Sequence, residues 1–307
     1  MADTTSPNAV PAVKPTIVDD KSPICIPFIL AQLKTHQAAK PDTPFFIALN
    51  GVQGAGKTTL VSALATTLRE KEGLETLVCS IDDLYLKHGD QVALATGNPL
   101  NPLVQHRGEP GTHDMTLARE FFTALKSGQP TKIPQYDKSQ FNGHGDRVPS
   151  SKWQSVNEPG QPPIRVIIFE GWSVGFRALT NAEVEAKASG PSTTLHKHRL
   201  EDLLFVNDKL REYDVMTDCF DAFIHVDAEE TKFVYDWRLQ QEAMLRREKG
   251  SGMTDEQVVH FVDGYYPAYE LYTQQLRDGV FRGQGKKGAQ LRLVVGKDRK
   301  VKHVYEI

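Results

Sequence analysis

The chain has 307 residues, with 36 Lys and Arg against 39 Asp and Glu, so its formal net charge at pH 7 is -3. This balance offers no polycationic surface for nucleic acid, and a mean hydropathy of -0.41 without a long apolar run argues against a membrane span. The three cysteines, Cys25, Cys79 and Cys219, lie far apart and predict neither a disulfide framework nor a zinc site. We therefore expect a protein of the cytoplasm, with the nucleus as the alternative, that binds neither nucleic acid nor membrane.

The N-terminal region is expected to have two parts. Residues 1–23 are rich in Pro, Thr, Ala and Val without apolar periodicity, which predicts a flexible tail. Residues 24–37 cluster apolar side chains on one side, which predicts a helix that packs on the domain before the turn at 41–44. We expect residues 24–307 to form one main domain.

The chain is organised around GVQGAGKT at residues 51–58, a match to the Walker A phosphate-binding loop. The apolar run at 45–50 predicts a buried strand before the loop, and apolar residues at helical spacing predict a helix after it. Glycines allow several backbone N–H groups to point at one phosphate, Lys57 can neutralise phosphate oxygens, and Thr58 can ligate Mg²⁺. The predicted ATP site consists of Gly51, Gln53, Gly54, Ala55, Gly56, Lys57, Thr58 and Thr59.

Two further apolar segments end in carboxylates. The predicted strand at 76–81 leads to Asp82 and Asp83, and the predicted strand at 164–169 leads to Glu170. Ligands bind at the carboxyl edge of an open α/β sheet, so the aspartate pair is a candidate general base for phosphoryl transfer, with an acidic helix cap as the alternative. Glu170 is a candidate for the Mg²⁺ shell.

Two later segments complete the predicted sheet. Residues 222–227 predict a fourth strand, and a charged helical stretch comes after it. Residues 291–295 predict a fifth, with 301–307 pairing back after a polar turn. Strands that alternate with helices predict an α/β protein with a P-loop NTPase fold, in which a mostly parallel sheet carries helices on both faces.

The region 98–163 is expected to be an insertion that binds the phosphate acceptor. Its polar residues lie in turns rich in Gly and Pro, where side chains face solvent or a ligand. Arg107, Lys138 and Arg147 could clamp an anionic acceptor, because an arginine can grip a carboxylate with two parallel hydrogen bonds. An ordinary solvated loop is the alternative for each of these residues taken alone.

The chain resembles the phosphoribulokinase, uridine kinase and pantothenate kinase group of P-loop kinases, and more closely the D-glycerate 3-kinases and their fungal ATP-dependent relatives. Beside the phosphate loop, the motifs that carry the resemblance are SIDDLY at 80–85, RGEPGTHD at 107–114, PQYDKS at 134–139 and FEGW at 169–172. Further matching segments are 206–210, 220–224, 237–242 and 266–269. The stretches 150–163 and 181–200 look like lineage-specific inserts, the second of them variable.

The resemblance implies roles for individual residues. It places the base at Asp82, with Glu170 near Mg²⁺ and Arg238 on a mobile lid that closes over the phosphates. The catalytic residues are then Lys57, Asp82 and Arg238, and the metal ligands are Thr58 and Glu170. The residues expected at the acceptor pocket are Asp83, Tyr85, Arg107, Thr112, His113, Asp114, Tyr136, Asp137, Lys138 and Arg147.

The function implied is an ATP-dependent kinase that transfers the γ-phosphoryl group, with Mg²⁺, to a hydroxyl of a small acid, D-glycerate being the leading candidate. A uridine- or pantothenate-type kinase with the same machinery is the nearest alternative. An ATP-binding regulatory or assembly factor without a small acceptor is a further alternative, although such a switch needs no acceptor base such as Asp82. The sequence does not decide the oligomeric state, with a monomer slightly favoured.

Overall fold

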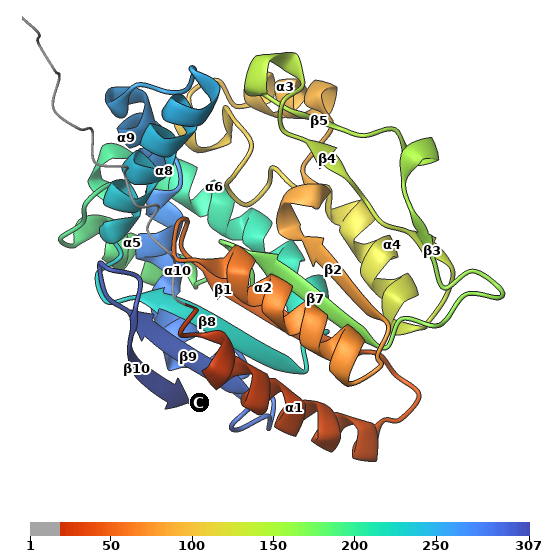
Figure 1. The fold of residues 1–307 in the computed structure, drawn as a ribbon. Helices are drawn as coiled ribbons and strands as arrows, with labels where there is room; N and C mark the ends of the chain where they lie inside the picture. Colours follow the sequence, from red (N-terminus) through yellow and green to blue (C-terminus); the bar gives the residue numbers. More distant parts are fainter. Residues whose placement is uncertain (1–18) are drawn as a thin grey trace, which may run out of the picture.

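A six-stranded sheet forms the centre of residues 19–307, the part of the chain that this computed structural model describes (Figure 1). Its strands are β1 (Phe45–Gly51), β2 (Thr76–Ser80), β7 (Val166–Gly171), β8 (Ala222–Ala228), β9 (Gln290–Val295) and β10 (Val301–Glu306). The strand order is β10-β9-β8-β1-β7-β2. Neighbouring strands are parallel from β2 through β9, and β10 pairs antiparallel with β9 at the edge.

Helices and two small ribbons surround this sheet. The helices are α1 (Ser22–Ala39), α2 (Lys57–Thr66), α3 (His88–Gly97), α4 (Met115–Lys126), α5 (Asn181–Ser189), α6 (Leu200–Leu210), α7 (Asp214–Thr217), α8 (Phe233–Lys249), α9 (Asp255–Asp263) and α10 (Tyr266–Asp278). In the ribbons, β3 (Thr131–Lys132) pairs with β6 (Ser155–Val156), and β4 (Tyr136–Asp137) pairs with β5 (Asp146–Arg147).

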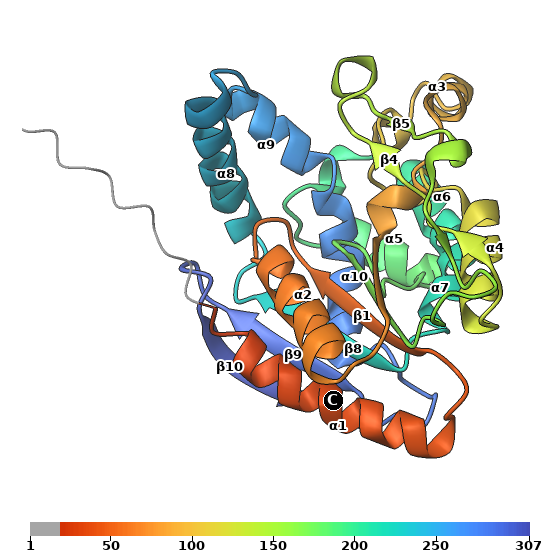
Figure 2. The same cartoon turned by 45° about the vertical axis from the view of Figure 1, so that its right-hand side comes forward.

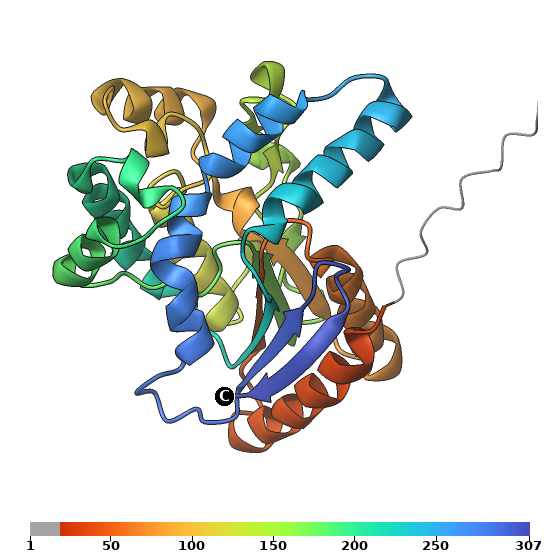
Figure 3. The same ribbon diagram turned by 90° about the vertical axis from the view of Figure 1, so that its left-hand side faces the viewer.

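Both faces of the sheet are buried. Successive side chains of β1 face opposite sides, so Phe45 lies against His36 of α1 at a ring distance of 5.2 Å, whereas Phe46 stacks on Phe122 of α4 at 6.1 Å. Helices α1 and α2 thus cover one face, and α4 and α10 cover the other (Figures 1 and 3). Burial on both sides explains why β1 and β8 read as near-continuous apolar runs.

The parallel strands end at one edge of the sheet, where two groups of elements flank the phosphate loop. Helices α8 and α9 stand on one side of this edge, and α3 with the β4–β5 ribbon stands on the other (Figure 2). The second group belongs to the long connection between β2 and β7. Ligands that bind at the carboxyl ends of the strands would therefore meet residues from both groups.

The predicted fold class is confirmed. The five predicted parallel strands appear as β1, β2, β7, β8 and β9, each within two residues of its predicted bounds, and the expected pairing of 301–307 appears as β10. The predicted helix at 24–37 is the longer α1, with a proline in its first turn. None of the helices within residues 19–307 is long and apolar enough to cross a bilayer, and the predicted location in the cell stays a prediction.

Two predicted segments are more structured than expected. Most of the predicted tail, 1–18, lies outside the described residues, but its last part is built into the fold. There the backbone N–H of Val301 donates to Asp20 at 2.7 Å, and the Lys21 ammonium donates to the Arg299 carbonyl at 2.7 Å. The predicted variable insert at 181–200 contains α5, whose first turn is stabilised by a capping box.

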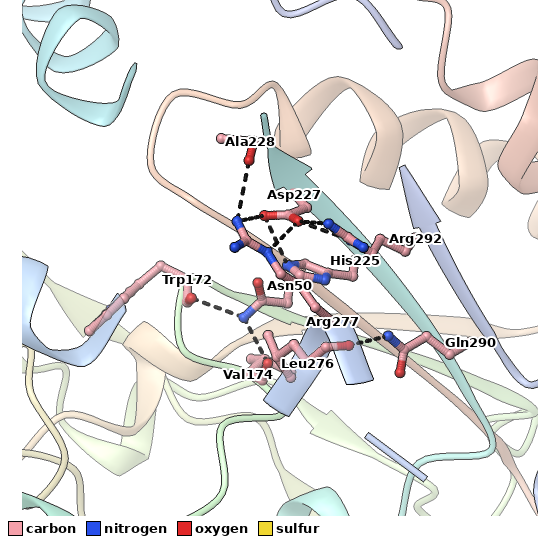
Figure 4. A network of polar contacts seen from close by, with 10 residues as sticks. All are labelled: Asn50, Trp172, Val174, His225, Asp227, Ala228, Leu276, Arg277, Gln290 and Arg292. Atoms are coloured by element: carbon pink, nitrogen blue, oxygen red, sulfur yellow. Dashed lines mark hydrogen bonds and ion pairs between the residues drawn. The ribbon is translucent and has the colours of Figure 1, made fainter. Parts of the chain in front are cut away.

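A buried ion cluster joins α10 to the sheet (Figure 4). The Asp227 carboxylate at the end of β8 is 1% exposed and accepts hydrogen bonds from Arg277 of α10 at 2.8 and 3.0 Å. Arg292 of β9 donates to the same carboxylate at 2.9 and 2.7 Å. Burial alone would raise the pKa of Asp227, but the hydrogen bonds and charges of the arginines and of His225 outweigh it and lower this pKa.

We expect Asp227→Asn to lower the free energy of unfolding at pH 7 by about 3–5 kcal/mol, because it leaves two arginines without their buried partner. A carboxyl whose folded-state pKa is lowered stabilises the fold above its unfolded pKa of about 4 and loses that contribution as the pH falls through the folded value. The difference between wild type and variant, measured by chemical denaturation, should therefore shrink in acid.

The matched control is Asp278→Asn on α10, the helix that carries Arg277. Asp278 contacts the exposed Arg282 at 3.5 Å, and such a surface pair contributes about 0–1 kcal/mol. Equal losses in the two variants would show that the Asp227 cluster contributes no more than a surface ion pair.

Candidate active site

The phosphate loop leads from β1 into α2 at the carboxyl edge of the sheet (Figure 1). Gly54 and Gly56 have φ angles of 84° and 95°, a left-handed conformation that glycine adopts at little cost. Helix α2 begins at Lys57, so its unpaired N–H groups and positive dipole end face the loop. Thr58 and Thr59 follow and are exposed, as binding to phosphate and Mg²⁺ would require.

Three distant segments hold the loop in this shape. A Cβ atom on Gly54 would lie 2.6 Å from Cβ of Trp237 in α8. The Arg299 Nε donates to the Gly54 carbonyl at 2.8 Å, and its guanidinium lies 5.3 Å from the Trp237 ring centre. The backbone N–H of Gln53 donates to the Tyr269 hydroxyl of α10 at 3.4 Å. Both α8 and α10 therefore position the loop from outside.

Lys57 is half-buried and lies against carbonyl oxygens of its own loop. Its ammonium donates to the carbonyl oxygens of Gly51 at 2.7 Å and Val52 at 3.4 Å. Burial lowers the pKa of Lys57, and the negative charges of Glu170 and Asp82 act in the opposite direction. The loop lysine and the two predicted carboxylates, which come from three separate segments, thus lie near one another.

Glu170 lies in β7, between the strand that carries the phosphate loop and the strand that leads to Asp82. In the sheet register it is opposite Leu49 of β1 and Ser80 of β2. Within residues 19–307, no group of three or more His, Cys, Asp or Glu side chains converges as a ready-made metal site. An ion here would therefore need oxygens from a bound ligand in addition to protein groups such as Thr58 and Glu170.

The two aspartates after β2 have different surroundings. Asp82 Oδ2 accepts from the Lys138 ammonium at 2.5 Å, while its Oδ1 is buried and has no hydrogen-bond partner within the described residues. Burial opposes ionisation, but the charge and hydrogen bond of Lys138 lower the pKa of Asp82. Asp83 instead accepts the backbone N–H of Tyr136 at 3.2 Å, and burial raises its pKa. Asp82 thus pairs with the Lys138 cation, whereas Asp83 bonds to the backbone of β4.

Aromatic side chains line the space beside Asp82. Tyr85 stacks on His113 at a ring distance of 4.4 Å and meets Tyr136 edge-on at 5.4 Å. The His113 Nδ1 pairs with the Tyr213 hydroxyl at 2.6 Å. Burial lowers the pKa of His113 to about 4, against the opposing effect of the Asp82 charge, so this ring is neutral at pH 7. Three of the residues predicted at the acceptor pocket, Tyr85, His113 and Tyr136, are thus brought together beside the predicted base, Asp82.

Several other predicted pocket residues stabilise the surrounding loops. The Thr112 hydroxyl accepts the backbone N–H of Gly108 at 2.9 Å and donates to the Glu109 carbonyl at 2.8 Å. Asp114 caps α4 by accepting the backbone N–H of Leu117 at 2.9 Å. These contacts form the RGEPGTHD loop without leaving the side chains free for a ligand.

The predicted arginine clamp differs from expectation because both arginines are engaged by the protein. Arg147, with 7% of its side chain exposed, pairs with Asp114 at 2.9 Å and donates to the Tyr85 carbonyl at 2.8 Å. Arg107 donates to the carbonyl oxygens of residues 143–144 at 2.7 and 2.5 Å. Arg107 is thus bonded to neutral carbonyl oxygens, and Arg147 to a carboxylate and a carbonyl oxygen. Of the three predicted cations, Lys138 is the one that contacts the candidate base, Asp82.

The PQYDKS turn presents Lys138 to Asp82. The Asp137 carboxylate accepts from the backbone N–H of Ser139 at 2.9 Å and from its hydroxyl at 2.6 Å. This local bonding fixes the backbone on both sides of Lys138. Asp137 therefore shapes the turn.

Arg238, predicted on a lid, lies in α8 and contacts α9. Its Nη1 donates to Gln241 at 2.8 Å, its Nη2 lies 3.5 Å from Glu242, and its guanidinium is 5.0 Å from the Phe261 ring centre. In this conformation Arg238 joins the two helices that flank the phosphate loop. Its predicted role over the phosphates stays a prediction.

Sequence reasoning did not predict that Trp237, Tyr269 and Arg299 hold the phosphate loop from a distance. No local pattern predicts that a helix more than 180 positions later would contact Gly54. It also passed over Glu109, which is 2% exposed and has no hydrogen-bond partner for either carboxyl oxygen among the described residues. Burial raises the pKa of Glu109 well above its usual value.

A glycine-rich loop between a central parallel strand and a helix defines a P-loop NTPase-type fold, and carboxylates near the loop lysine are typical of its kinases. The model of the KAP family P-loop domain matches residues 25–135. Two curated relatives share much of the chain. The uncharacterized kinase mug58 of Schizosaccharomyces pombe is 42% identical over 78% of this chain and 86% of its own length. The chloroplastic D-glycerate 3-kinase of Arabidopsis thaliana is 38% identical over 76% of this chain, which spans 48% of that protein.

A solved structure agrees with these relatives. The D-glycerate 3-kinase from Cryptococcus neoformans var. grubii superposes with a TM-score of 0.83 at 35% identity, covering 92% of this chain and 98% of that one. The chain belongs to the family of P-loop kinases that comprises these D-glycerate 3-kinases and the related fungal kinases. It is therefore an ATP-dependent phosphotransferase.

We expect Gly54→Ala to weaken ATP binding about tenfold or more. The added Cβ would meet Trp237 at 2.6 Å, and the positive φ strains any residue with a side chain, so the loop must move away from its phosphate-binding shape. The measurement is the ATP dissociation constant by isothermal titration calorimetry.

Gly73→Ala is the matched control for backbone strain alone, because Gly73 also has positive φ, 65°, but an added Cβ would meet nothing within 4 Å. This variant should lose about 1 kcal/mol of stability and bind ATP normally. Equal weakening of ATP binding in both variants would contradict the proposed contact between Gly54 and Trp237.

Proposed function

We propose that this kinase phosphorylates a hydroxyl of a small hydroxy acid, and that D-glycerate is its acceptor. The observation that carries the proposal is the arrangement after β2, where Asp82 lies 2.5 Å from the Lys138 ammonium and within electrostatic reach of Lys57. Such a site suits an acceptor that brings a hydroxyl to a base and an anionic group to a cation. D-glycerate has both groups, and two relatives are named D-glycerate 3-kinases.

The proposed transfer begins with ATP on the phosphate loop. Backbone N–H groups of residues 51–59 and the start of α2 bind its phosphates, and Lys57 exchanges the Gly51 carbonyl for a phosphate oxygen. Asp82 accepts the proton of the acceptor hydroxyl. The hydroxyl oxygen then forms a bond to the γ-phosphorus while the bond between that phosphorus and ADP breaks, which yields ADP and the phosphorylated acid.

Mg²⁺ fits the oxygen donors at this edge. Thr58, an exposed residue, follows the loop lysine, and Glu170 supplies a carboxylate from the neighbouring strand. Hard oxygen donors of this kind, completed by phosphate and water, are what Mg²⁺ prefers, and the bound ion would offset negative charge on the phosphates. We propose Arg238 as a further cation that approaches the phosphates when α8 and α9 close.

The pocket walls favour a small acceptor that carries charge. His113 is neutral and packed between Tyr85 and Tyr213, so it supplies a wall and no positive charge. Asp82 and Lys138 supply the charged groups. A nucleoside such as uridine lacks an anion to interact with Lys138, whereas pantothenate carries its carboxylate far from its hydroxyl.

The acceptor is tested by measuring ADP release from ATP and Mg²⁺ with D-glycerate, L-glycerate, pantothenate, uridine or ribulose 5-phosphate. We expect D-glycerate to give the highest kcat/KM, because it presents an anion close to a primary hydroxyl. Stimulation by uridine alone would overturn the proposed acceptor. ATP binding without stimulation by any of the five would favour a regulatory or assembly role.

The base is tested by Asp82→Asn, which keeps the size and polarity of the side chain but removes the proton acceptor. We expect kcat with D-glycerate to fall by roughly 10²–10⁴-fold while the ATP dissociation constant changes little. Asp83→Asn is the matched control, because the asparagine oxygen can still accept the backbone N–H of Tyr136. A larger loss in Asp83→Asn, with ATP binding intact in both variants, would reassign the base.

A further inference from the structure

The ion pair between Lys138 and Asp82 occupies the group that the reaction needs. The Lys138 ammonium lies 2.5 Å from Asp82 Oδ2, and Oδ1 of the same carboxylate is buried. The exposed fractions of the side chains are 56% for Lys138 and 27% for Asp82, so the cation covers the carboxylate from the solvent side. A hydroxyl that approaches Oδ2 of Asp82 must therefore compete with this ammonium.

An aspartate in such an ion pair is a weak base. The ammonium stabilises the carboxylate and so opposes uptake of a proton from the acceptor hydroxyl. The charge and hydrogen bond of Lys138 lower the pKa of Asp82 in spite of its burial. Productive transfer therefore requires the ammonium to move to another anionic partner.

Lys138 is built to move while its backbone stays in place. The turn is fixed on both sides by the Asp137 carboxylate, which accepts from the backbone and hydroxyl groups of Ser139. The lysine side chain is more than half exposed and flexible, and its ion pair with Asp82 is solvent-accessible. Such a pair is held weakly enough for a competing anion to replace it.

We propose that Lys138 is a latch on Asp82 that the anionic group of the acceptor releases. Without an acceptor, the lysine covers the carboxylate. When a hydroxy acid binds, its anionic group takes over the ammonium, and the freed Asp82 oxygen accepts the hydroxyl proton. This inference rests on the proposed function and adds to it a reason why the acceptor must be anionic.

The other cations do not fill this role. Arg147 is paired with Asp114, and Arg107 donates to two backbone carbonyl oxygens. Because the same ammonium contacts first the base and then the acceptor's anion, the hydroxyl and the anion of the acceptor must lie within a few bonds of each other. The latch thus selects short hydroxy acids and keeps Asp82 from activating water while ATP is bound alone.

The test compares wild type with Lys138→Ala, using D-glycerate and glycerol, its neutral analogue without the carboxylate. With D-glycerate, kcat/KM should fall about 10–100-fold in the variant, the usual effect of losing a hydrogen bond between charged groups. With glycerol, kcat/KM should stay the same or rise, because the base is no longer covered. The ratio of the two kcat/KM values is the main readout.

A second readout is ATP hydrolysis without an acceptor, in which a water oxygen bonds to the γ-phosphorus, the bond to ADP breaks and Asp82 accepts a proton. This rate should rise about tenfold in Lys138→Ala, since a freed general base can contribute 10²–10⁴-fold. Lys138→Arg keeps the charge and should restore part of the preference for D-glycerate. Lys132→Ala, an exposed lysine of the same insertion whose ammonium is 3.5 Å from the Ser150 carbonyl, is the control and should match wild type.

Two outcomes would overturn the latch. If Lys138→Ala lowers kcat equally with both acceptors and raises the KM for ATP, Lys138 acts on the transferring phosphoryl group instead. If the preference for D-glycerate and the rate of hydrolysis are unchanged, the ion pair has no part in selection. Failure of the proposed acceptor is distinguishable from both, because wild type itself would then show no stimulation by D-glycerate.

Discussion

The structure depends on the burial of β1 in the middle of a parallel sheet. A strand with neighbours on both sides must pair every backbone N–H and C=O group, and parallel neighbours require long crossovers that return the chain to the same starting edge. The carboxyl ends of β7, β1 and β2 consequently meet at one edge. Glu170, the phosphate loop and Asp82 are brought together by this pairing, although the sequence separates them widely.

The charges gathered at this edge are satisfied by the protein itself. Lys57 lies against loop carbonyl oxygens, and the exposed Lys138 pairs with the partly buried Asp82. Arg147 and Asp114 form a third pair behind the pocket. A charged ligand therefore does not meet unpaired charges at this edge. It must replace an internal partner, and replacement of this kind discriminates between ligands by charge better than burial alone does.

The sequence was informative where a local pattern has one structural solution. Buried strands read as apolar runs, and the loop glycines adopt backbone angles that other residues avoid, so β1, the phosphate loop and Asp82 could be placed without coordinates. The partners of Arg147 could not be predicted in this way, because Asp114 and the Tyr85 carbonyl lie 33 and 62 positions away in the sequence. The spacing of apolar residues predicts which helices and strands form, whereas contacts between loops far apart in the sequence decide which cation lies near the base.

The position of Arg238 follows from what holds the loop. Helix α10 is fixed to the sheet by Arg277 on Asp227 and to the loop by Tyr269 on Gln53, while α8 is fixed by Trp237 against Gly54. Under the proposed closure, movement that preserves the phosphate loop would begin in α8 beyond Trp237 and extend into α9. Arg238 is the next residue after Trp237, so it would lie at the boundary between the part of α8 that contacts the loop and the part that moves. Under the proposed closure of α8 and α9, a cation at that boundary would approach bound phosphates without displacing the loop that binds them.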